Sequence, residues 1–143
     1  MNTQSDLRAC SECLCLTSRR AARTMTRAFD RQLRPYGIRA TQFTILAMLE
    51  LRGPTPIGTL AESLGMERTT LTRNLALLEA KRWVDIRADK DDARARIVAT
   101  APKGRAMVAT ALPAWQKAQA AASAEIGAAG MAALHALAQN STH

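Results

Sequence analysis

Three consecutive patterns in the chain predict a mainly α-helical fold with a small two-stranded β wing. Residues 57–64 carry apolar side chains at helical spacing, and the glycine that follows is the usual residue where a helix must turn through positive φ. Residues 65–83 again show helical spacing. Residues 84–88 and 95–100 alternate like strands on either side of a charged turn. Two short helices, a tight turn and a charged hairpin together predict a winged helix-turn-helix.

The helix predicted at residues 65–83 has two different faces. Leu71, Leu75 and Leu78 recur at i, i+4 and i+7 and make one apolar stripe. The polar positions gather in the first turns: Arg68, Thr69, Thr70, Thr72 and Arg73. Hydroxyl groups and helix-terminal amides can reach phosphates, and arginine can donate two hydrogen bonds to guanine. An ordinary amphipathic surface helix has the same stripe, so the flanking turn and hairpin decide in favour of DNA recognition.

The same region resembles the MarR family of bacterial transcription regulators. The resemblance is dense from Thr41 to Gly104. It rests on these residues: Leu60, Ala61, Glu62, Leu64, Thr72, Arg73, Leu75, Leu78, Glu79, Asp91, Asp92, Arg94, Arg96, Ile97, Val98, Thr100 and Gly104. The resemblance implies a homodimeric winged helix-turn-helix protein that binds double-stranded DNA. It also implies a regulator, here expected to be a repressor, of the kind that often responds to a small molecule or an oxidant.

The wing and the end of the helix before it carry further expectations. We expect Arg94 and Arg96 in the wing to contact the backbone or the minor groove of DNA. Asp92 carries the charge of the phosphates, so we expect it to orient Arg94 and not to touch DNA. Arg82 stands where the family usually has glycine, so the sequence leaves open how the helix ends.

Composition favours a nucleic-acid partner. The 143 residues carry a net charge of +8, and 16 of the 20 cations are arginine. A basic chain is typical of proteins that bind polyanions, although a solvated basic surface is the simpler alternative. Two Phe, two Trp and one Tyr are too few for a platform that stacks single-stranded bases. No signal-peptide pattern and no apolar run long enough for a bilayer is evident, which predicts a cytoplasmic protein without a membrane partner.

The chain before this domain predicts one long helix at about residues 8–34. Pro35 cannot continue a helix without strain. A very apolar helix is expected at residues 42–51, with Thr41 as its N-cap. The two prolines in residues 52–56 predict a loop that separates this helix from the helix-turn-helix.

The chain after the wing predicts an alanine-rich helix at residues 102–126. Pro113 lies inside it and should bend it, because proline removes one backbone donor. Gly127 and Gly130 are expected to break the chain before a last helix at residues 131–138. Few large apolar groups occur here, which favours packing against a partner chain. We therefore expect dimerisation helices in residues 1–36 and 102–143, around a DNA-binding domain at residues 37–101.

The three cysteines of the chain, Cys10, Cys13 and Cys15, lie within six residues. The family includes oxidant sensors with a thiol near the start of the first helix, so the resemblance implies that part for Cys13 or Cys15. If Ser11 caps the helix, the helix dipole favours the thiolate form of both Cys13 and Cys15. Arg19 lies on the same face as Cys15 and would also favour a thiolate there. One unbroken helix cannot direct all three sulfurs at one metal, but a soft metal or metalloid shared by two subunits remains open. Small apolar side chains at a dimer seam are the simpler alternative.

The sequence also allows another effector and other functions. The alternative effector is a small aromatic or acidic ligand in a cleft between the helix-turn-helix and the dimer helices, lined by Arg23, Tyr36 and Trp115. No cofactor is required. A thiol oxidoreductase using Cys10 and Cys13 would need a βαβ pattern, and the chain predicts a long helix there. A protein-interaction module is disfavoured by the basic wing. No catalytic constellation stands out, so we do not expect an enzyme.

Overall fold

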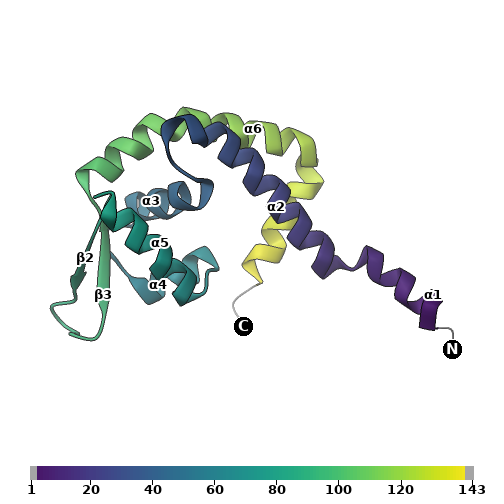
Figure 1. Ribbon diagram of the computed structural model, residues 1–143, viewed down its shortest axis with the longest axis horizontal. Coiled ribbons are helices and arrows are strands. Elements are labelled where there is room, and N and C mark those ends of the chain that lie inside the picture. Colours follow the sequence, from purple (N-terminus) through teal and green to yellow (C-terminus); the bar gives the residue numbers. More distant parts are fainter. Residues whose placement is uncertain (1–2, 141–143) are drawn as a thin grey trace.

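The computed structural model describes residues 3–140 and is mainly helical with a small antiparallel sheet (Figure 1). The elements are α1 (Thr3–Arg8), the 3-10 helix η1 (Ala9–Glu12), α2 (Leu14–Leu33), η2 (Arg34–Tyr36), α3 (Ala40–Arg52), β1 (Thr55–Pro56), α4 (Ile57–Leu64), α5 (Arg68–Ala80), β2 (Val84–Ala88), β3 (Arg96–Thr100) and α6 (Pro102–Gln139). The predicted fold class is confirmed. The helix-turn-helix is α4 and α5, and the wing is the β2–β3 hairpin.

The sheet has a third strand that the sequence did not predict. Its order is β1-β3-β2, with both pairs antiparallel. Thr55 pairs with Val98 and Pro56 with Ile97, so the expected loop at residues 52–56 contains a short edge strand. An edge position suits Pro56, because proline has no N–H to donate to a neighbouring strand. The strand ties the start of α4 to the base of the wing.

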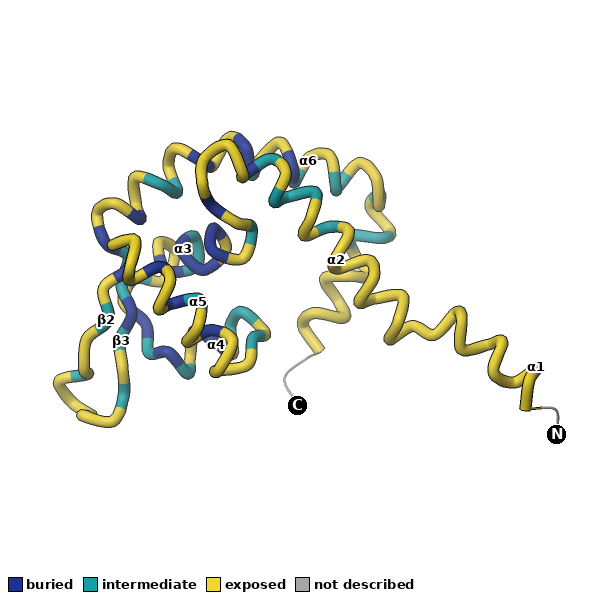
Figure 2. The backbone as a smooth tube through the Cα atoms, in the orientation of Figure 1, coloured by how far each residue is buried: buried dark blue, intermediate teal, exposed yellow. Residues whose placement is uncertain are grey.

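The hydrophobic core lies where α3, α4, α5, the sheet and the first half of α6 meet. Figure 2 shows buried positions concentrated there and almost none in the N-terminal helices. The apolar stripe of α5 supplies Leu71, Leu75 and Leu78, each at most 1% exposed. These leucines pack in one cluster with apolar residues of α3 and with Val98 of β3. The core therefore holds α5 by one face and leaves the other face outside.

The N-terminal segment is not one long helix. Cys13 is extended, with ψ 124°, and its amide donates to the Cys10 carbonyl oxygen at 3.2 Å, which closes η1 before α2 begins at Leu14. Ser11 is therefore not the cap of α2, and its hydroxyl donates instead to the carbonyl oxygen of Arg8. No residue of α1 is buried, so packing within the chain does not hold this segment in line with α2.

The start of α3 is capped from another helix. The sequence predicted Thr41 as the N-cap, but the helix begins at Ala40 and Arg39 is its N-cap residue. The Ala40 amide donates to Asp30 Oδ1 of α2 at 2.7 Å, and the Arg39 amide donates to Gln42 Oε1 at 3.1 Å. Two side chains thus satisfy amides that the helix itself leaves unpaired, and Asp30 joins α2 to the DNA-binding domain.

The C-terminal element α6 consists of two helical parts joined at a kink. Only Gly127 departs from helical geometry, with φ 71° and ψ 173°, whereas Gly130 and Pro113 lie inside the helix. The expected break is therefore found at Gly127, and the expected last helix at residues 131–138 lies in the second helical part of α6, after this kink. Taken as a whole, α6 is long and apolar enough to cross a membrane by length and composition alone, which the sequence did not predict, but the kink at Gly127 divides it. Its first half packs on α2 and α3, and its second half leaves apolar surface exposed.

Candidate nucleic-acid interface

The outward face of α5 carries the residues predicted to contact DNA. All five of them are exposed: Arg68, Thr69, Thr70, Thr72 and Arg73. The Thr72 hydroxyl donates to the carbonyl oxygen of Arg68 at 2.8 Å, which fixes its direction while its lone pairs stay available. Neither arginine has an ion-pair partner among the described residues 3–140. A rigid helix therefore presents two cations and three hydroxyls from its first turns.

The turn before α5 leaves the start of this helix open. Gly65 adopts φ 61° and ends α4, and the amide of Met66 donates to the Ala61 carbonyl oxygen at 3.0 Å. Glu67 occupies the N-cap position, but its side chain makes no capping hydrogen bond. Amides in the first turn of α5 thus remain available to an anion, and helix N-termini favour phosphate.

The wing turn is organised by aspartate side chains. Asp92 Oδ1 accepts a hydrogen bond from the Arg94 amide at 3.0 Å, and Asp89 Oδ1 accepts one from the Asp91 amide at 3.1 Å. The structure thus gives Asp92 a direct contact through which it orients the backbone of Arg94. Arg94 and Arg96 are both exposed, on the hairpin that projects from the body of the molecule (Figure 1).

The structure shows how α5 ends at Arg82, the position where the family usually has glycine. Arg82 adopts the left-handed conformation, with φ 60°, and is the non-glycine residue that does so among the described residues 3–140. The Trp83 amide donates to the Leu78 carbonyl oxygen at 2.9 Å, and the Trp83 carbonyl oxygen accepts from the Ala101 amide at 2.9 Å. The helix therefore ends as a glycine-capped helix would, with arginine in the strained position.

Gly104 is a structural residue of this region that the sequence pattern alone did not explain. It is buried in the first turn of α6, and a Cβ at this position would overlap the Trp83 carbonyl oxygen. The close approach lets α6 pack against the junction between α5 and β2. A glycine just after the strand that ends at Thr100 is the signal that could have indicated this contact.

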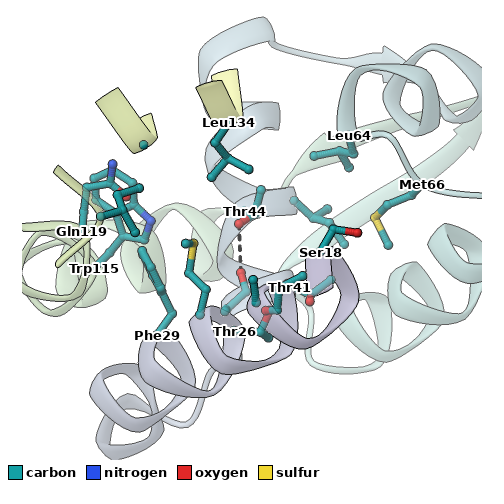
Figure 3. Close-up of a pocket in the computed structure, with 17 residues that line it drawn as sticks. Ser18, Thr26, Phe29, Thr41, Thr44, Leu64, Met66, Trp115, Gln119 and Leu134 are labelled. Atoms are coloured by element: carbon teal, nitrogen blue, oxygen red, sulfur yellow. Dashed lines mark hydrogen bonds between the residues drawn. The ribbon is translucent and has the colours of Figure 1, made fainter. Parts of the chain in front are cut away.

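A cleft of about 770 Å³ lies between α2, α3, the turn before α5, and α6 (Figure 3). Trp115 lines it and stacks on Phe43, with ring centroids 6.1 Å apart. The predicted lining by Arg23 and Tyr36 is wrong. Arg23 lies about 120° around α2 from Phe29, which does line the cleft, and Tyr36 belongs to η2 at the far end of that helix. Within the part of the chain that the structure describes, no charged side chain lines the cleft.

The three cysteines lie at the break between η1 and α2, and all are exposed. Cys10 belongs to η1, Cys13 is the N-cap of α2 and Cys15 lies in its first turn. Among the described residues, these thiols do not form a group of three or more ligands that could hold a metal ion. The hydrogen bond from Cys13 to Cys10 closes a turn, which brings their Cα atoms to within about 7 Å.

Comparison with known proteins places the chain among transcription regulators. The model of the MarR family matches residues 36–95. The M. tuberculosis transcriptional regulator MosR, in a crystal structure with DNA, is 40% identical with a TM-score of 0.81, over 89% of this chain and 94% of that chain. An E. coli MarR mutant complexed with operator DNA shares the fold at 22% identity, with a TM-score of 0.78, over 94% of this chain and 98% of that chain.

A curated relative agrees with these matches. YwoH, an uncharacterized HTH-type transcriptional regulator of Bacillus subtilis (strain 168), is 30% identical over 80 residues, or 56% of this chain. The match spans 58% of YwoH, less than two thirds of its length. On the strength of the matched residues, the helix-turn-helix and the wing, this chain belongs to the MarR family of DNA-binding transcriptional regulators.

Proposed function

We propose that the protein is a homodimeric repressor that reads a pseudo-palindromic operator by placing α5 in the major groove. The observation that carries the proposal is the two-faced geometry of α5, whose leucines are fixed in the core while Arg68 and Arg73 stay free outside. The MosR crystal structure with DNA supports a duplex partner. A bound dimer would cover promoter DNA that polymerase needs. The site of action would be the cytoplasm.

The test begins with an operator selected in vitro from a random duplex library. A two-fold dimer places two recognition helices one helical turn apart, so the half-sites should be centred about 10 bp apart. Arg68→Ala and Arg73→Ala should each weaken binding to that operator by roughly 1–3 kcal/mol if the side chain pairs with a base. Arg52→Ala, at an exposed position of α3, is the matched control and should change affinity little.

Two results would contradict the proposal. If Arg68→Ala and Arg73→Ala bind the operator as tightly as Arg52→Ala, α5 does not read the bases. If the operator is bound by a monomer with full affinity, the pseudo-palindrome has no basis. Transcription in vitro from a promoter that contains the operator separates repression from activation, since a repressor lowers the amount of transcript in proportion to operator occupancy.

The proposed dimer uses the terminal helices. Leu7, Leu14 and Leu137, all on the terminal helices, are 60%, 83% and 66% exposed in the single chain. Because these apolar side chains of the terminal helices lie outside the core, we expect the helices to pack against a partner chain. The second half of α6 and the segment before α2 would supply that surface, and their positions would set the spacing of the two α5 helices.

We further propose that chemistry at the cysteines releases the DNA. The turn at Cys10 and Cys13 favours a disulfide between them, because the Cα atoms of a disulfide lie about 4.4–6.8 Å apart. Two thiols would lose two electrons and two protons to a peroxide, which would be reduced to water. A soft metal or metalloid would act similarly by joining thiolates of two protomers. Either event would reshape the segment before α2, next to the proposed dimer surface.

The switch is tested with a variant in which Cys10, Cys13 and Cys15 are all serine. Peroxide, arsenite or zinc should release the wild-type protein from operator DNA and leave the variant bound. A full switch requires a bias of about 5.5 kcal/mol between dimer shapes, which covalent or metal–thiolate chemistry can supply. Release of the variant by the same agent would reject the cysteine switch.

The cleft favours a second candidate effector. Its described lining has aromatic, aliphatic and hydroxyl side chains but no charged one, so it suits a neutral apolar molecule better than the acidic ligand that the sequence left open (Figure 3). Binding would bridge α2 and the turn before α5 and so change the position of the recognition helix. Trp115→Ala should abolish the response of DNA binding to such a molecule while leaving the response to peroxide intact.

A further inference from the structure

Arginines form a continuous ridge along α2 that the proposed operator contact does not use. The ridge consists of Arg20, Arg23, Arg27 and Arg31 of α2 and of Arg34, the first residue of η2 directly after it, spaced three or four residues apart. All five are exposed, and none of their side chains has a hydrogen bond or an ion pair among the described residues 3–140. At 1.5 Å per residue the ridge is about 21 Å long, and at 3.6 residues per turn it spans an arc of about 80°.

The arginine ridge lies on the face of α2 opposite to its packed face. Met25 and Phe29 line the cleft, and the arginines lie about half a turn away around the helix axis. Leu14, whose exposure favours a partner chain, lies on the same side as Met25. A partner that covers the apolar side of α2 would therefore leave the arginine ridge in solvent.

Most of the excess positive charge of the chain lies in the flanking segments, which include the ridge. Residues 37–101, which contain the helix-turn-helix and the wing, hold ten Lys and Arg against eight Asp and Glu, a net charge of +2. The flanking residues 1–36 and 102–143 hold ten against four, a net charge of +6. Most of the excess positive charge is thus outside the part of the chain that reads DNA.

We propose that the arginine ridge is a second, sequence-independent binding surface for double-stranded DNA, so that a dimer on its operator holds another DNA segment. Figure 1 shows α2, the helix that carries most of the ridge, beside α6, whereas the wing projects from another side of the molecule. We expect a duplex on the ridge to be separate from the duplex at the N-terminal half of α5. Five guanidinium groups in a row match the regular phosphates of a duplex backbone, which bind by counterion release. Holding a second segment on a bound operator rests on the proposed function of α5.

Charge and composition favour DNA over the other partners of a basic ridge. A second copy of the chain matches it poorly, because its flanking segments offer four acidic residues in all, and Asp30 already caps α3. A helix that lies on an anionic membrane presents apolar side chains beside its cations. From Arg20 to Arg34, the face of α2 that carries the arginines has no apolar side chain.

Two triple variants with the same net charge test the inference. The ridge variant is Arg23→Gln/Arg27→Gln/Arg31→Gln. The control variant is Arg8→Gln/Lys103→Gln/Lys117→Gln, which removes three exposed cations that do not form one face. Glutamine has nearly the helix propensity of arginine and lysine, so both variants should fold, which circular dichroism checks. Selected operator duplex on beads is loaded with each full-length protein, and a labelled unrelated duplex is then added.

The wild-type protein and the control variant should capture the unrelated duplex on operator beads, and the ridge variant should capture about tenfold less at 150 mM salt. In solution, the logarithm of the binding constant for the unrelated duplex should fall less steeply with the logarithm of the salt concentration for the ridge variant. This salt slope should be shallower by about 0.9 for each phosphate that the side chains no longer neutralise. No capture by the wild-type protein, equal loss in both triple variants, or stronger binding to phosphatidylserine vesicles than to DNA would overturn the inference. Failure of every protein to bind operator beads would reject the proposed function instead, and the solution slopes would still decide the ridge.

Discussion

Arg82 shows how a single residue can keep a backbone conformation that suits glycine. Its φ of 60° places it in the left-handed region, which costs a residue with a Cβ about 1–2 kcal/mol. Arg82→Gly should therefore raise the free energy of unfolding by about 0.5–1 kcal/mol, since the entropy of glycine offsets part of the gain. Urea unfolding at fixed protein concentration measures this change in the free energy of unfolding. Arg87→Gly, in β2, is the control and should lower stability; equal effects would show that Arg82 is not strained.

Gly104 presents the opposite case, a glycine required by space. A Cβ there would overlap the Trp83 carbonyl oxygen, which is backbone and already accepts a hydrogen bond from Ala101. Gly104→Ala should lower the free energy of unfolding by about 1–3 kcal/mol, the range for overpacking. Gly58→Ala, inside α4 with open space around its Cβ, should instead raise stability slightly, because alanine favours helix. Thermal unfolding of both variants checks the contrast, which a stable Gly104→Ala protein would contradict.

At the scale of elements, the wing gives a prediction about how affinity depends on sequence and salt. Arg94 is exposed in a turn that Asp92 braces through the Arg94 amide. Arg94→Ala should weaken binding to operator and unrelated duplexes alike and reduce the salt slope by about 1. Asp92→Ala should weaken binding less, because it removes the brace but keeps the cation. Fluorescence anisotropy at several salt concentrations measures both, and an unchanged slope in Arg94→Ala would remove the wing from the interface.

Elements that depend on neighbours in sequence were predictable, and those that depend on distant contacts were not. The leucine spacing of α5 and the alternation around the wing turn are local patterns, and both elements formed, although α5 covers residues 68–80 and not the predicted 65–83. The cap of α3 by Asp30 and the pairing of Thr55 with Val98 join separate segments, which no local pattern records. The break at Gly127 was predictable, because glycine is the residue that most easily leaves helical geometry.

The candidate sites divide in the same way. The exposed residues of α5 followed from the same periodicity that buried its leucines. The prediction that Arg23 lines the cleft was wrong, although the sequence could have shown this. The helical period that directs Phe29 into the cleft directs Arg23 away from it. The break between η1 and α2 at Cys13 could not be predicted, because cysteine is not a residue that typically ends a helix. The break is seen in the structure as the turn in which the Cys13 amide donates to the Cys10 carbonyl oxygen.

At the scale of the whole molecule, the single chain leaves its apolar surface and its charge in different places. Among the described residues, six of the eight exposed leucines lie in the terminal helices, and the arginine ridge lies on another side of α2. The core that holds α5 is built within the single chain and includes Leu33 of α2 and Ala111 and Ala114 of α6. Dimerisation would therefore act on DNA binding through the placement of two preformed domains and not through the folding of either one.

This separation predicts how a damaged dimer should behave. Leu14→Glu and Leu137→Glu place a charge on exposed apolar positions of the terminal helices, so the chain should keep its fold but lose its partner at micromolar concentration. Affinity for the complete operator should then fall roughly 100-fold, because two linked half-sites raise the effective concentration of the second domain. Affinity for an isolated half-site should stay unchanged. Leu51→Glu, 81% exposed on α3, is the control and should remain dimeric. Sedimentation and anisotropy measure both properties, and a monomer that keeps full affinity for the operator would show that the terminal helices do not set the spacing.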